Sequence, residues 1–363
     1  MTTTKNQNFL LTQPIKSNFP PHAITSTEAF DATMRVRTSL GIRPTGFYGN
    51  YHMDNTIDVH LANINKDTSI TFELKHDDKI DSNVIHLQVA TLFTAPSGQR
   101  RIRIHNLATN VAHKYADVFS HANNNVLMSY LLKMAILEGK VKATMDIKDT
   151  LVDSSVNVLA MYRKHCSSGS PPGQLILPET IKLLPLMLHS LVRHDVLSTE
   201  SSIPCDQRAY LRAIIANKPL LATQILLYPM IHELSSFVPL EGRLGTQVRC
   251  RYDRLKSDSC YLITNGLNLF FWIGQNVSDE FIQGVFQLEN ARMVSSENCN
   301  IHYEDGENEH VIQVRDSIEL VRKKYSFGHF MRLCGFGGEK NLSKKILGIG
   351  TFFRDILPTP PSQ

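Results

Sequence analysis

The stretch GQRRIRIHNL, residues 98–107, gathers positive charge in a pattern that could bind an anion. Arg101, Arg103 and His105 alternate with two isoleucines, and this period of two predicts a β-strand whose isoleucines point into a core while the basic side chains point outward. An arginine guanidinium can hold a carboxylate or a phosphate through two parallel hydrogen bonds. The anion that fits this chemistry is a nucleic acid, a membrane surface or the acidic tail of another protein.

Other arginines are predicted to lie on the same sheet. Arg35 and Arg37 alternate with apolar residues in an earlier strand, and Arg100 opens the later one. A solvated sheet face that discourages aggregation also explains such charges. A surface that binds RNA would interleave aromatic side chains with the cations, but the neighbours here are aliphatic. An acidic peptide or an anionic lipid headgroup therefore fits better, with weak, salt-sensitive binding, because exposed ion pairs contribute about 0.2–1 kcal/mol each.

The chain carries no recognisable catalytic or metal-binding motif. Its 15 histidines include no His-Glu-x-x-His pair and have no spacing with the cysteines that suits zinc. The segment GFGGEK at 335–340 lacks the spacing of a phosphate-binding loop. No Gly-x-Ser-x-Gly segment marks a nucleophilic serine. We therefore expect a binding protein that needs no cofactor and is not an enzyme.

Composition indicates a soluble globular protein of two to three domains. The 363 residues are 42% hydrophobic and 20% charged, and the net charge of +4 is small for a dedicated nucleic-acid-binding protein. The six cysteines lie far apart without a Cys-x-x-Cys pair, which favours reduced thiols in the cytosol. The sequence shows no signal peptide and no apolar run of about 18 residues, so any action at a membrane is expected from its cytosolic face.

Five segments are predicted along the chain. Short alternating strands separated by turns indicate a β-sandwich, and the period then becomes helical. Two apolar strands followed by helices indicate a further α/β module. The segments are a flexible leader at 1–27, a β-sandwich at 28–110, a helical domain at 111–228, an α/β module at 229–325 and a divergent basic tail at 326–363.

Turn residues locate several of these elements. Gly98 offers a positive φ for a hairpin between two strands of the sandwich, and Asn265-Gly266 is a strong signal for a second hairpin. The helix predicted at 177–197 contains Pro185, which should kink it.

Three parts of the chain carry a family resemblance in long, continuous stretches. They are FDATMRVRTSLGIRPTGFYGNYHMDNTIDV with TLFTAPSGQRRIRIHNLATN, PGQLILPETIKLLPLMLHSLVRHDVL, and YLITNGLNLFFWIGQNVS. In that order they resemble the β-sandwich, the helical domain and the gelsolin-like module of the Sec24 family, the cargo adaptors of the COPII vesicle coat. The details HDD, GQRRIRIHNL and GQLILPE resemble the C/D subclass most. The resemblance runs from about Phe30 to about Tyr325.

The resemblance implies an α+β multidomain fold with a β-sandwich, an all-α helical bundle and a gelsolin-like α/β module. It also implies a non-catalytic cytoplasmic coat subunit, peripheral on endoplasmic reticulum exit sites and COPII vesicles, that binds sorting signals in the cytosolic tails of cargo and SNARE proteins. Further implied partners are the coat's GTPase-activating subunit, its small GTPase and the anionic membrane, with no nucleic acid. We expect Leu92 and Phe93 to form an apolar wall for cargo, and Arg100, Arg101 and Arg103 to contact carboxylates.

Two departures from the family pattern qualify this expectation. The family's zinc finger and trunk have no counterpart here, so no zinc is expected, and the sandwich, which borrows strands from sequence ahead of the zinc finger, should have an open edge. From Ser326 onward the sequence does not align, so the gelsolin-like module is expected to be truncated. The chain is then a C-terminal fragment or a shortened gene product. A regulatory fragment that competes with the full-length adaptor and an actin-binding protein related to gelsolin are the alternatives.

Overall fold

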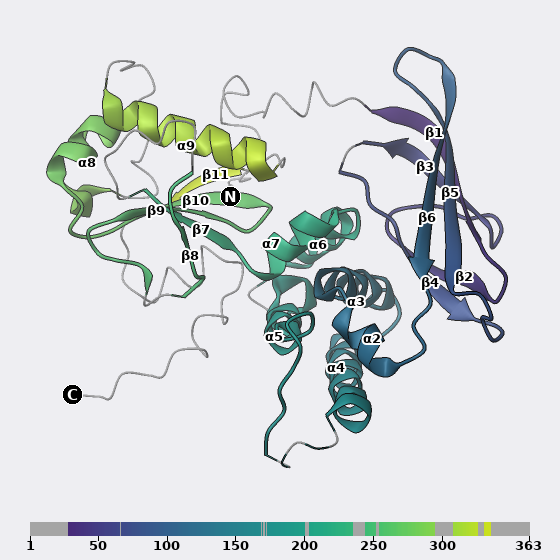
Figure 1. The fold of residues 1–363 in the computed structure, drawn as a ribbon. Coiled ribbons are helices and arrows are strands. Elements are labelled where there is room, and N and C mark those ends of the chain that lie inside the picture. Colours follow the sequence, from purple (N-terminus) through teal and green to yellow (C-terminus); the bar gives the residue numbers. More distant parts are fainter. Residues whose placement is uncertain are drawn as a thin grey trace, which may run out of the picture.

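The computed structural model describes residues 28–325 and 330–334, apart from 66, 168, 170, 172, 200–202, 235–243, 252–253 and 295–307. Within this range the chain forms a β-sandwich, then a helical unit, then a second sheet with its own helices. Figure 1 shows the helical unit between the two sheet-containing units. This order confirms the predicted α+β multidomain architecture. The predicted leader at 1–27 lies outside the described residues.

The sandwich has a four-stranded and a two-stranded layer, and all of its strand pairs are antiparallel. The larger sheet contains, in spatial order, β3 (Asp58–Ile64), β1 (Ala29–Thr38), β5 (Val84–Thr94) and β6 (Arg100–Asn110). The smaller sheet pairs β2 (Ile42–Tyr48) with β4 (Thr71–His76). Gly98 has a φ of +79° in the turn between β5 and β6, so the hairpin predicted there is confirmed.

The core of the sandwich lies between β1, β3 and the smaller sheet, and Val89 and Phe93 of β5 form its margin. Its buried residues are Ala32, Met34, Val36, Phe47, Val59 and Leu61. No residue of β6 belongs to this core, and every residue of β6 is exposed. The reason is that the second layer has two strands and the first has four, so β6 extends beyond the second layer. The prediction that Ile102 and Ile104 point into a core is therefore wrong.

The helical unit packs around one hydrophobic core. Its helices are α2 (Tyr115–Ser120), α3 (Asn124–Glu138), α4 (Thr144–Cys166), α5 (Leu184–Arg193), α6 (Cys205–Ala216) and α7 (Leu220–Leu227), with a 3-10 turn at Asp195–Leu197. The Asn123 side chain caps α3 by accepting hydrogen bonds from two backbone N–H groups of its first turn. The prediction of one helix at 177–197 with a kink at Pro185 is wrong. Helix α5 begins at Leu184, so Pro185 lies in its first turn. The N–H groups of a first turn have no carbonyl partner within the helix, so a proline is tolerated there without a kink.

Polar bonds connect the sandwich to α3. The hydroxyl groups of Tyr48 and Tyr130 both donate to Oε1 of Glu73, the first across 2.9 Å. Lys133 donates through Nζ to the carbonyl oxygen and the hydroxyl oxygen of Ser69, each at 3.0 Å. Side chains of the helical unit thus satisfy polar groups of the sandwich at the contact between the two units.

The third unit is a five-stranded sheet in the order β11–β10–β9–β7–β8. Its elements are β7 (Met230–Glu233), β8 (Gln247–Val248), β9 (Cys260–Thr264), β10 (Asn268–Ile273), α8 (Asp279–Phe286), a 3-10 turn at Ala291–Met293, α9 (Glu309–Tyr325) and β11 (Phe330–Cys334). The predicted hairpin at Asn265-Gly266 joins β9 to β10, with a φ of +79° at Gly266. Phe271 faces a core shared with α8 and α9, and its neighbour Trp272 faces a smaller core on the opposite side of the sheet.

Strand β11 lies in a segment that the sequence assigned to a basic tail. Residues 330–334 pair in parallel with β10, so the tail prediction is wrong for these five residues. Sequence periodicity could not reveal this, because a parallel pairing depends on a partner strand far away along the chain. The rest of the predicted tail, 326–329 and 335–363, lies outside the described residues. Among the helices that are described, none has both the length and the apolar character needed to cross a membrane.

Candidate functional site

The β5–β6 hairpin separates its side chains onto two faces of the larger sheet. The register places Arg103 opposite Thr91, and Thr91 opposite Met34 of β1. Met34 is buried in the sandwich core, and directly opposed residues share a face, so Arg103 lies on the inner face of the sheet. Arg101 and His105 lie two residues to either side and therefore share that face. We call Arg101, Arg103 and His105 the basic row.

The outer face of the same strands carries exposed aliphatic side chains. Ile102 lies opposite Leu92, and Ile104 lies opposite Ala90. Leu92, Ile102 and Ile104 expose 38%, 62% and 51% of their surface, and we call these three the aliphatic row. The alternation seen in the sequence is therefore real, but its direction is the reverse of the prediction: the cations lie on the inner side, beyond the second layer, and the isoleucines face outward.

The five residues predicted to bind cargo do not share one face. The register places Leu92 and Arg100 on the outer face, and Phe93, Arg101 and Arg103 on the inner face. Phe93 is partly buried against the sandwich core, directly opposite Arg101. Leu92 and Phe93 are neighbours in one strand, so they point to opposite sides and cannot form a single apolar wall.

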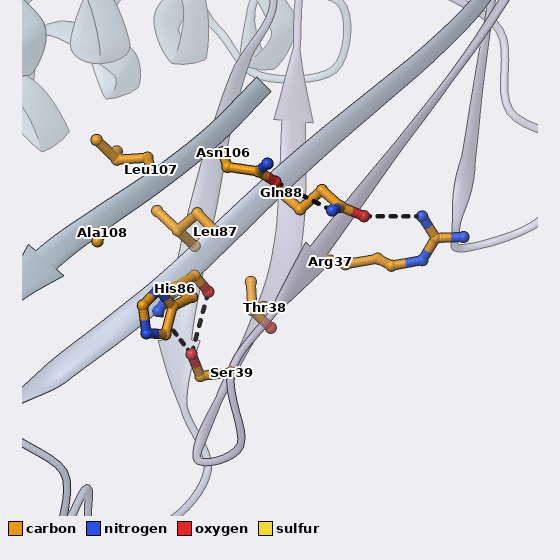
Figure 2. Close-up of a pocket in the computed structure, with 9 residues that line it drawn as sticks. All are labelled: Arg37, Thr38, Ser39, His86, Leu87, Gln88, Asn106, Leu107 and Ala108. Carbon is orange, nitrogen blue, oxygen red and sulfur yellow. Dashed lines mark hydrogen bonds between the residues drawn. The ribbon is translucent and has the colours of Figure 1, made fainter. Parts of the chain in front are cut away.

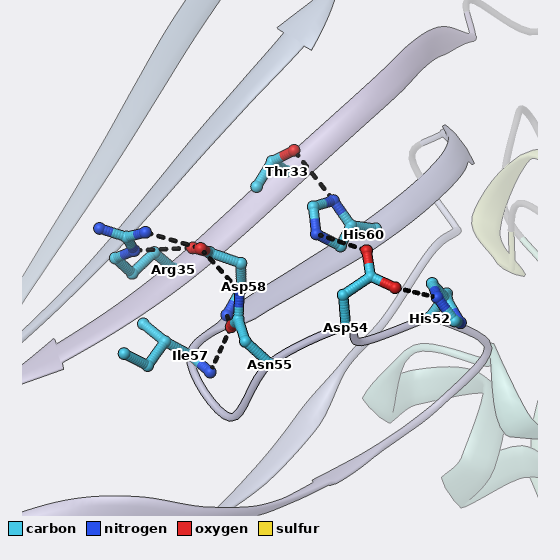
Figure 3. A network of polar contacts seen from close by, with 8 residues as sticks. All are labelled: Thr33, Arg35, His52, Asp54, Asn55, Ile57, Asp58 and His60. Carbon is cyan, nitrogen blue, oxygen red and sulfur yellow. Dashed lines mark hydrogen bonds and ion pairs between the residues drawn. The ribbon is translucent and has the colours of Figure 1, made fainter.

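Two of the clustered arginines already have a carboxylate partner. Arg35 donates to Asp58 from Nε at 2.7 Å and from Nη2 at 2.6 Å, which makes the bidentate pair in Figure 3. These hydrogen bonds hold the pKa of the Asp58 carboxyl below its usual value. Arg100 donates from Nη1 to the carbonyl oxygen of Asp31 at 2.6 Å and to its carboxylate at 2.8 Å. Neither arginine is free to receive an acidic ligand without giving up these bonds.

Arg101 and Arg103 differ from those two. Arg101 donates from Nη2 to the neutral side-chain oxygen of Gln99 at 2.6 Å. Within the described part of the chain, Arg103 has no hydrogen-bonded or ion-paired side-chain partner. These two guanidinium groups lie on one face of an exposed strand without a carboxylate, so they are the strongest candidates for binding an anion.

A shallow hollow of about 500 Å³ lies at the other end of these strands (Figure 2). Gln88 accepts a hydrogen bond from Arg37 at 3.3 Å and donates one to Asn106 at 3.0 Å. The Ser39 hydroxyl bonds to the backbone of His86 and not to its imidazole. The hollow therefore holds no serine activated by a histidine, and its amide groups satisfy one another.

The carboxylate of Asp54, in the loop before β3, lies near two histidines, His52 of the same loop and His60 of β3, as Figure 3 shows. His52 Nε2 lies 2.7 Å from one Asp54 oxygen, and His60 Nε2 lies 3.8 Å from the other. The other ring nitrogen of His60 lies 3.3 Å from the Thr33 hydroxyl. Among the described residues, no group of His, Cys, Asp and Glu side chains could hold a metal ion. We assign these contacts a structural role: Asp54 and His52 fix the loop against His60 of β3, and His60 in turn contacts Thr33 of β1.

Comparisons with known proteins match the three units in order. Residues 29–112 match the Sec23/Sec24 beta-sandwich domain, residues 123–224 the Sec23/Sec24 helical domain, and residues 243–309 the gelsolin repeat. Human protein transport protein Sec24C is 40% identical over 272 residues, which cover 74% of this chain. The chain belongs to the Sec24 family.

Within the Sec24 family the chain is C/D-like, as its sequence motifs indicated. Human protein transport protein Sec24D is 37% identical over 270 residues, again 74% of this chain. The crystal structure of the human COPII-coat protein Sec24c matches with a TM-score of 0.80 and 33% identity, covering 90% of this chain and 42% of that chain. The chain spans about a quarter of the length of these curated relatives, 24% of Sec24C and 26% of Sec24D. Their names describe transport and coat proteins, not enzymes.

Proposed function

We propose that this chain binds acidic sorting signals in the cytosolic tails of cargo and SNARE proteins as a non-catalytic part of a COPII coat. The observation that supports this most directly is the pair Arg101 and Arg103, exposed on one face of β6 and without a carboxylate partner among the described residues. The fork of each guanidinium matches a carboxylate. The similarity to Sec24 proteins supplies the setting, a peripheral coat on the cytosolic side of endoplasmic reticulum exit sites and vesicles.

The five proposed site residues have different roles in this scheme. Arg101 and Arg103 contact the carboxylates of the signal, and Phe93 supports Arg101 from the neighbouring strand. Arg100, bonded to Asp31, fixes the end of the hairpin, and Leu92 adds apolar contact on the outer face. The coat's GTPase-activating subunit, its small GTPase and the anionic membrane are proposed as partners from family likeness alone. The scheme needs no cofactor and no nucleic acid.

Removing the two arginines that lack a carboxylate partner among the described residues is expected to weaken binding of an acidic tail peptide. Each exposed ion pair contributes about 0.2–1 kcal/mol, so Arg101→Ala with Arg103→Ala should raise Kd by about 2- to 30-fold. Fluorescence anisotropy of a labelled acidic SNARE-tail peptide measures this directly. Affinity for the wild-type chain should also fall as salt rises, because exposed charges are screened.

A matched variant controls for the loss of two positive charges. Arg37→Ala with Arg43→Ala removes the same charge from the sandwich but leaves β6 intact, so it should leave Kd within about twofold of wild type. Equal weakening by both double variants would contradict a specific site. Wild-type binding to vesicles of anionic lipid or to polyuridine, without binding to the peptide, would overturn the proposal in favour of a lipid or an RNA.

A further inference from the structure

Strand β6 is an edge strand whose outer backbone groups are unpaired within the described chain. Bonded and non-bonded residue pairs alternate along an antiparallel ladder. The ladder of β5 and β6 is bounded by two backbone bonds, Ala95 N to Gln99 O and Val111 N to Asn83 O, each 2.9 Å long. Both bonds continue the register of the ladder, and their β6-side residues, 99 and 111, are odd-numbered. Because bonded pairs recur at every second residue, the odd-numbered residues of β6 are the ones whose N–H and C=O groups bond to β5. The even-numbered residues therefore direct their N–H and C=O groups to the free edge.

The two rows described above flank this free edge. Ile102 and Ile104 offer backbone donors and acceptors toward the edge and aliphatic side chains on the outer face. Arg101 and Arg103 present guanidinium groups on the inner face. A strand added to such an edge gains backbone hydrogen bonds, and its side chains alternate between the same two faces. The edge can therefore select a segment in which two kinds of side chain alternate, because every second residue faces the arginines and the others face the isoleucines.

Charge indicates what kind of segment fits. Strand β6 contains no Asp or Glu, so a second copy of this edge would bring no carboxylate to the arginines. Residues 1–27 contain Lys5 and Lys16 and likewise no Asp or Glu. Neither β6 of a second copy nor residues 1–27 bring a carboxylate to this edge, whereas a partner that carries its own acids can both pair with the backbone of β6 and neutralise Arg101 and Arg103.

We propose that β6 binds an extended partner segment in which acidic and aliphatic residues alternate, added as an extra strand to the larger sheet. The acidic residues contact the basic row on the inner face, and the aliphatic residues contact the aliphatic row on the outer face. This inference rests on the proposed function and deepens it, because it defines the chemistry of the acidic signal and its bound conformation.

Two peptides of equal composition test the pattern. Labelled Glu-Val-Glu-Val-Glu-Val and Glu-Glu-Glu-Val-Val-Val carry the same charge, but only the first presents all its carboxylates on one face of a strand. The alternating peptide is expected to bind roughly tenfold more tightly in anisotropy. If both bind equally, and Arg101→Ala with Arg103→Ala weakens both, acidic-signal binding stands and strand addition is overturned. If neither binds, both proposals are overturned.

A proline at the free edge tests the backbone pairing. Ile104→Pro removes an N–H that points away from β5, which an edge strand tolerates, while Ile104→Val keeps this N–H and most of the side chain. The proline variant should lose about tenfold in affinity for the alternating peptide and keep its melting temperature, whereas the valine variant, which loses one methylene of the aliphatic row, should lose no more than about threefold. Wild-type affinity in a folded proline variant would overturn strand addition.

Residue-resolved hydrogen exchange on the full chain gives an independent readout that needs no variant. The amides of Ile102 and Ile104 should exchange rapidly in the free chain and become protected when the peptide binds. The amide of Arg103, bonded to β5, should exchange slowly in both states. Protection of the two isoleucine amides without peptide would show that another segment or a second copy already occupies the edge, which would overturn the proposal.

Discussion

Replacing Phe271 with alanine is expected to lower the free energy of unfolding of the gelsolin-like unit by about 3–5 kcal/mol. Phe271 lies on β10, which is paired on both sides, with β11 and with β9, and its side chain is fully buried. Its ring lies 5.9 Å from the ring of Phe286 on α8, centroid to centroid. Truncation removes contacts with both layers and leaves a cavity, because the sheet and the helix can collapse into the vacated space only in part.

The single tryptophan of the chain makes this measurement specific. Trp272 is the neighbour of Phe271 on β10 and is largely buried, so its fluorescence during denaturant unfolding reports on this unit and not on the sandwich or the helices. Met293→Ala, which truncates a half-exposed side chain in the same unit, should change the free energy of unfolding by less than about 1 kcal/mol. A loss below about 1 kcal/mol for Phe271→Ala would show that the core is not packed as described.

Local sequence signals predicted the hairpins, because each is decided by a few adjacent residues. The turns at Gly98 and Gly266 both need a positive φ, which glycine adopts without strain. The capping asparagine ahead of α3 is local in the same sense. Such signals state where an element begins or turns, and they do not depend on what packs against it.

The faces of β6 could not be predicted in the same way. Alternation shows that Arg101 and Arg103 share one side and that Ile102 and Ile104 share the other. It cannot show which side is covered, because that depends on the width of the opposite sheet. A two-stranded second layer leaves β6 uncovered on both faces, so aliphatic residues that look like a core are surface residues.

The candidate site needed the structure for a related reason. The sequence groups Arg35, Arg100, Arg101 and Arg103 by charge alone. It does not show that Asp58 and Asp31 already neutralise the first two, because these partners lie 23 and 69 residues away along the chain. His105 was not among the residues predicted to bind cargo, although the alternation that places Arg101 and Arg103 on one face places His105 there too. Alternation alone groups Arg101, Arg103 and His105 on one face, and the structure adds that Arg35 and Arg100 are already neutralised.

The stability of the contact between sandwich and helices is expected to rise with pH between about 8 and 10.5 because of Lys133. This side chain is 2% exposed, and among the described residues its Nζ donates to no acceptor but the neutral oxygens of Ser69. Burial lowers the pKa of Lys133 to about 8 from an ordinary 10.5. Between these two values the unfolded chain holds a proton that the folded chain has released, so the free energy of unfolding increases as pH rises, by about 2 kcal/mol from pH 7 to 9.5.

Other buried groups act in the opposite direction, so the effect is measured as a difference between variants. Burial raises the pKa values of Tyr48 and Cys250 to about 12, and the stability that these groups contribute is lost as pH rises toward those values. They are present in both wild type and Lys133→Met, and they cancel when the two unfolding curves are subtracted. From pH 7 to 9.5 the wild type should therefore gain about 2 kcal/mol relative to Lys133→Met, followed by circular dichroism.

A variant of an exposed lysine just beyond the same helix distinguishes the effect of burying Lys133 from the effect of removing one positive charge. Lys140→Met removes the same charge two residues after α3 ends, where the side chain is exposed, so its curve should run parallel to that of wild type. A curve for Lys133→Met that also runs parallel to wild type would mean that Lys133 is solvated, and that the contact between the two units is open at this position.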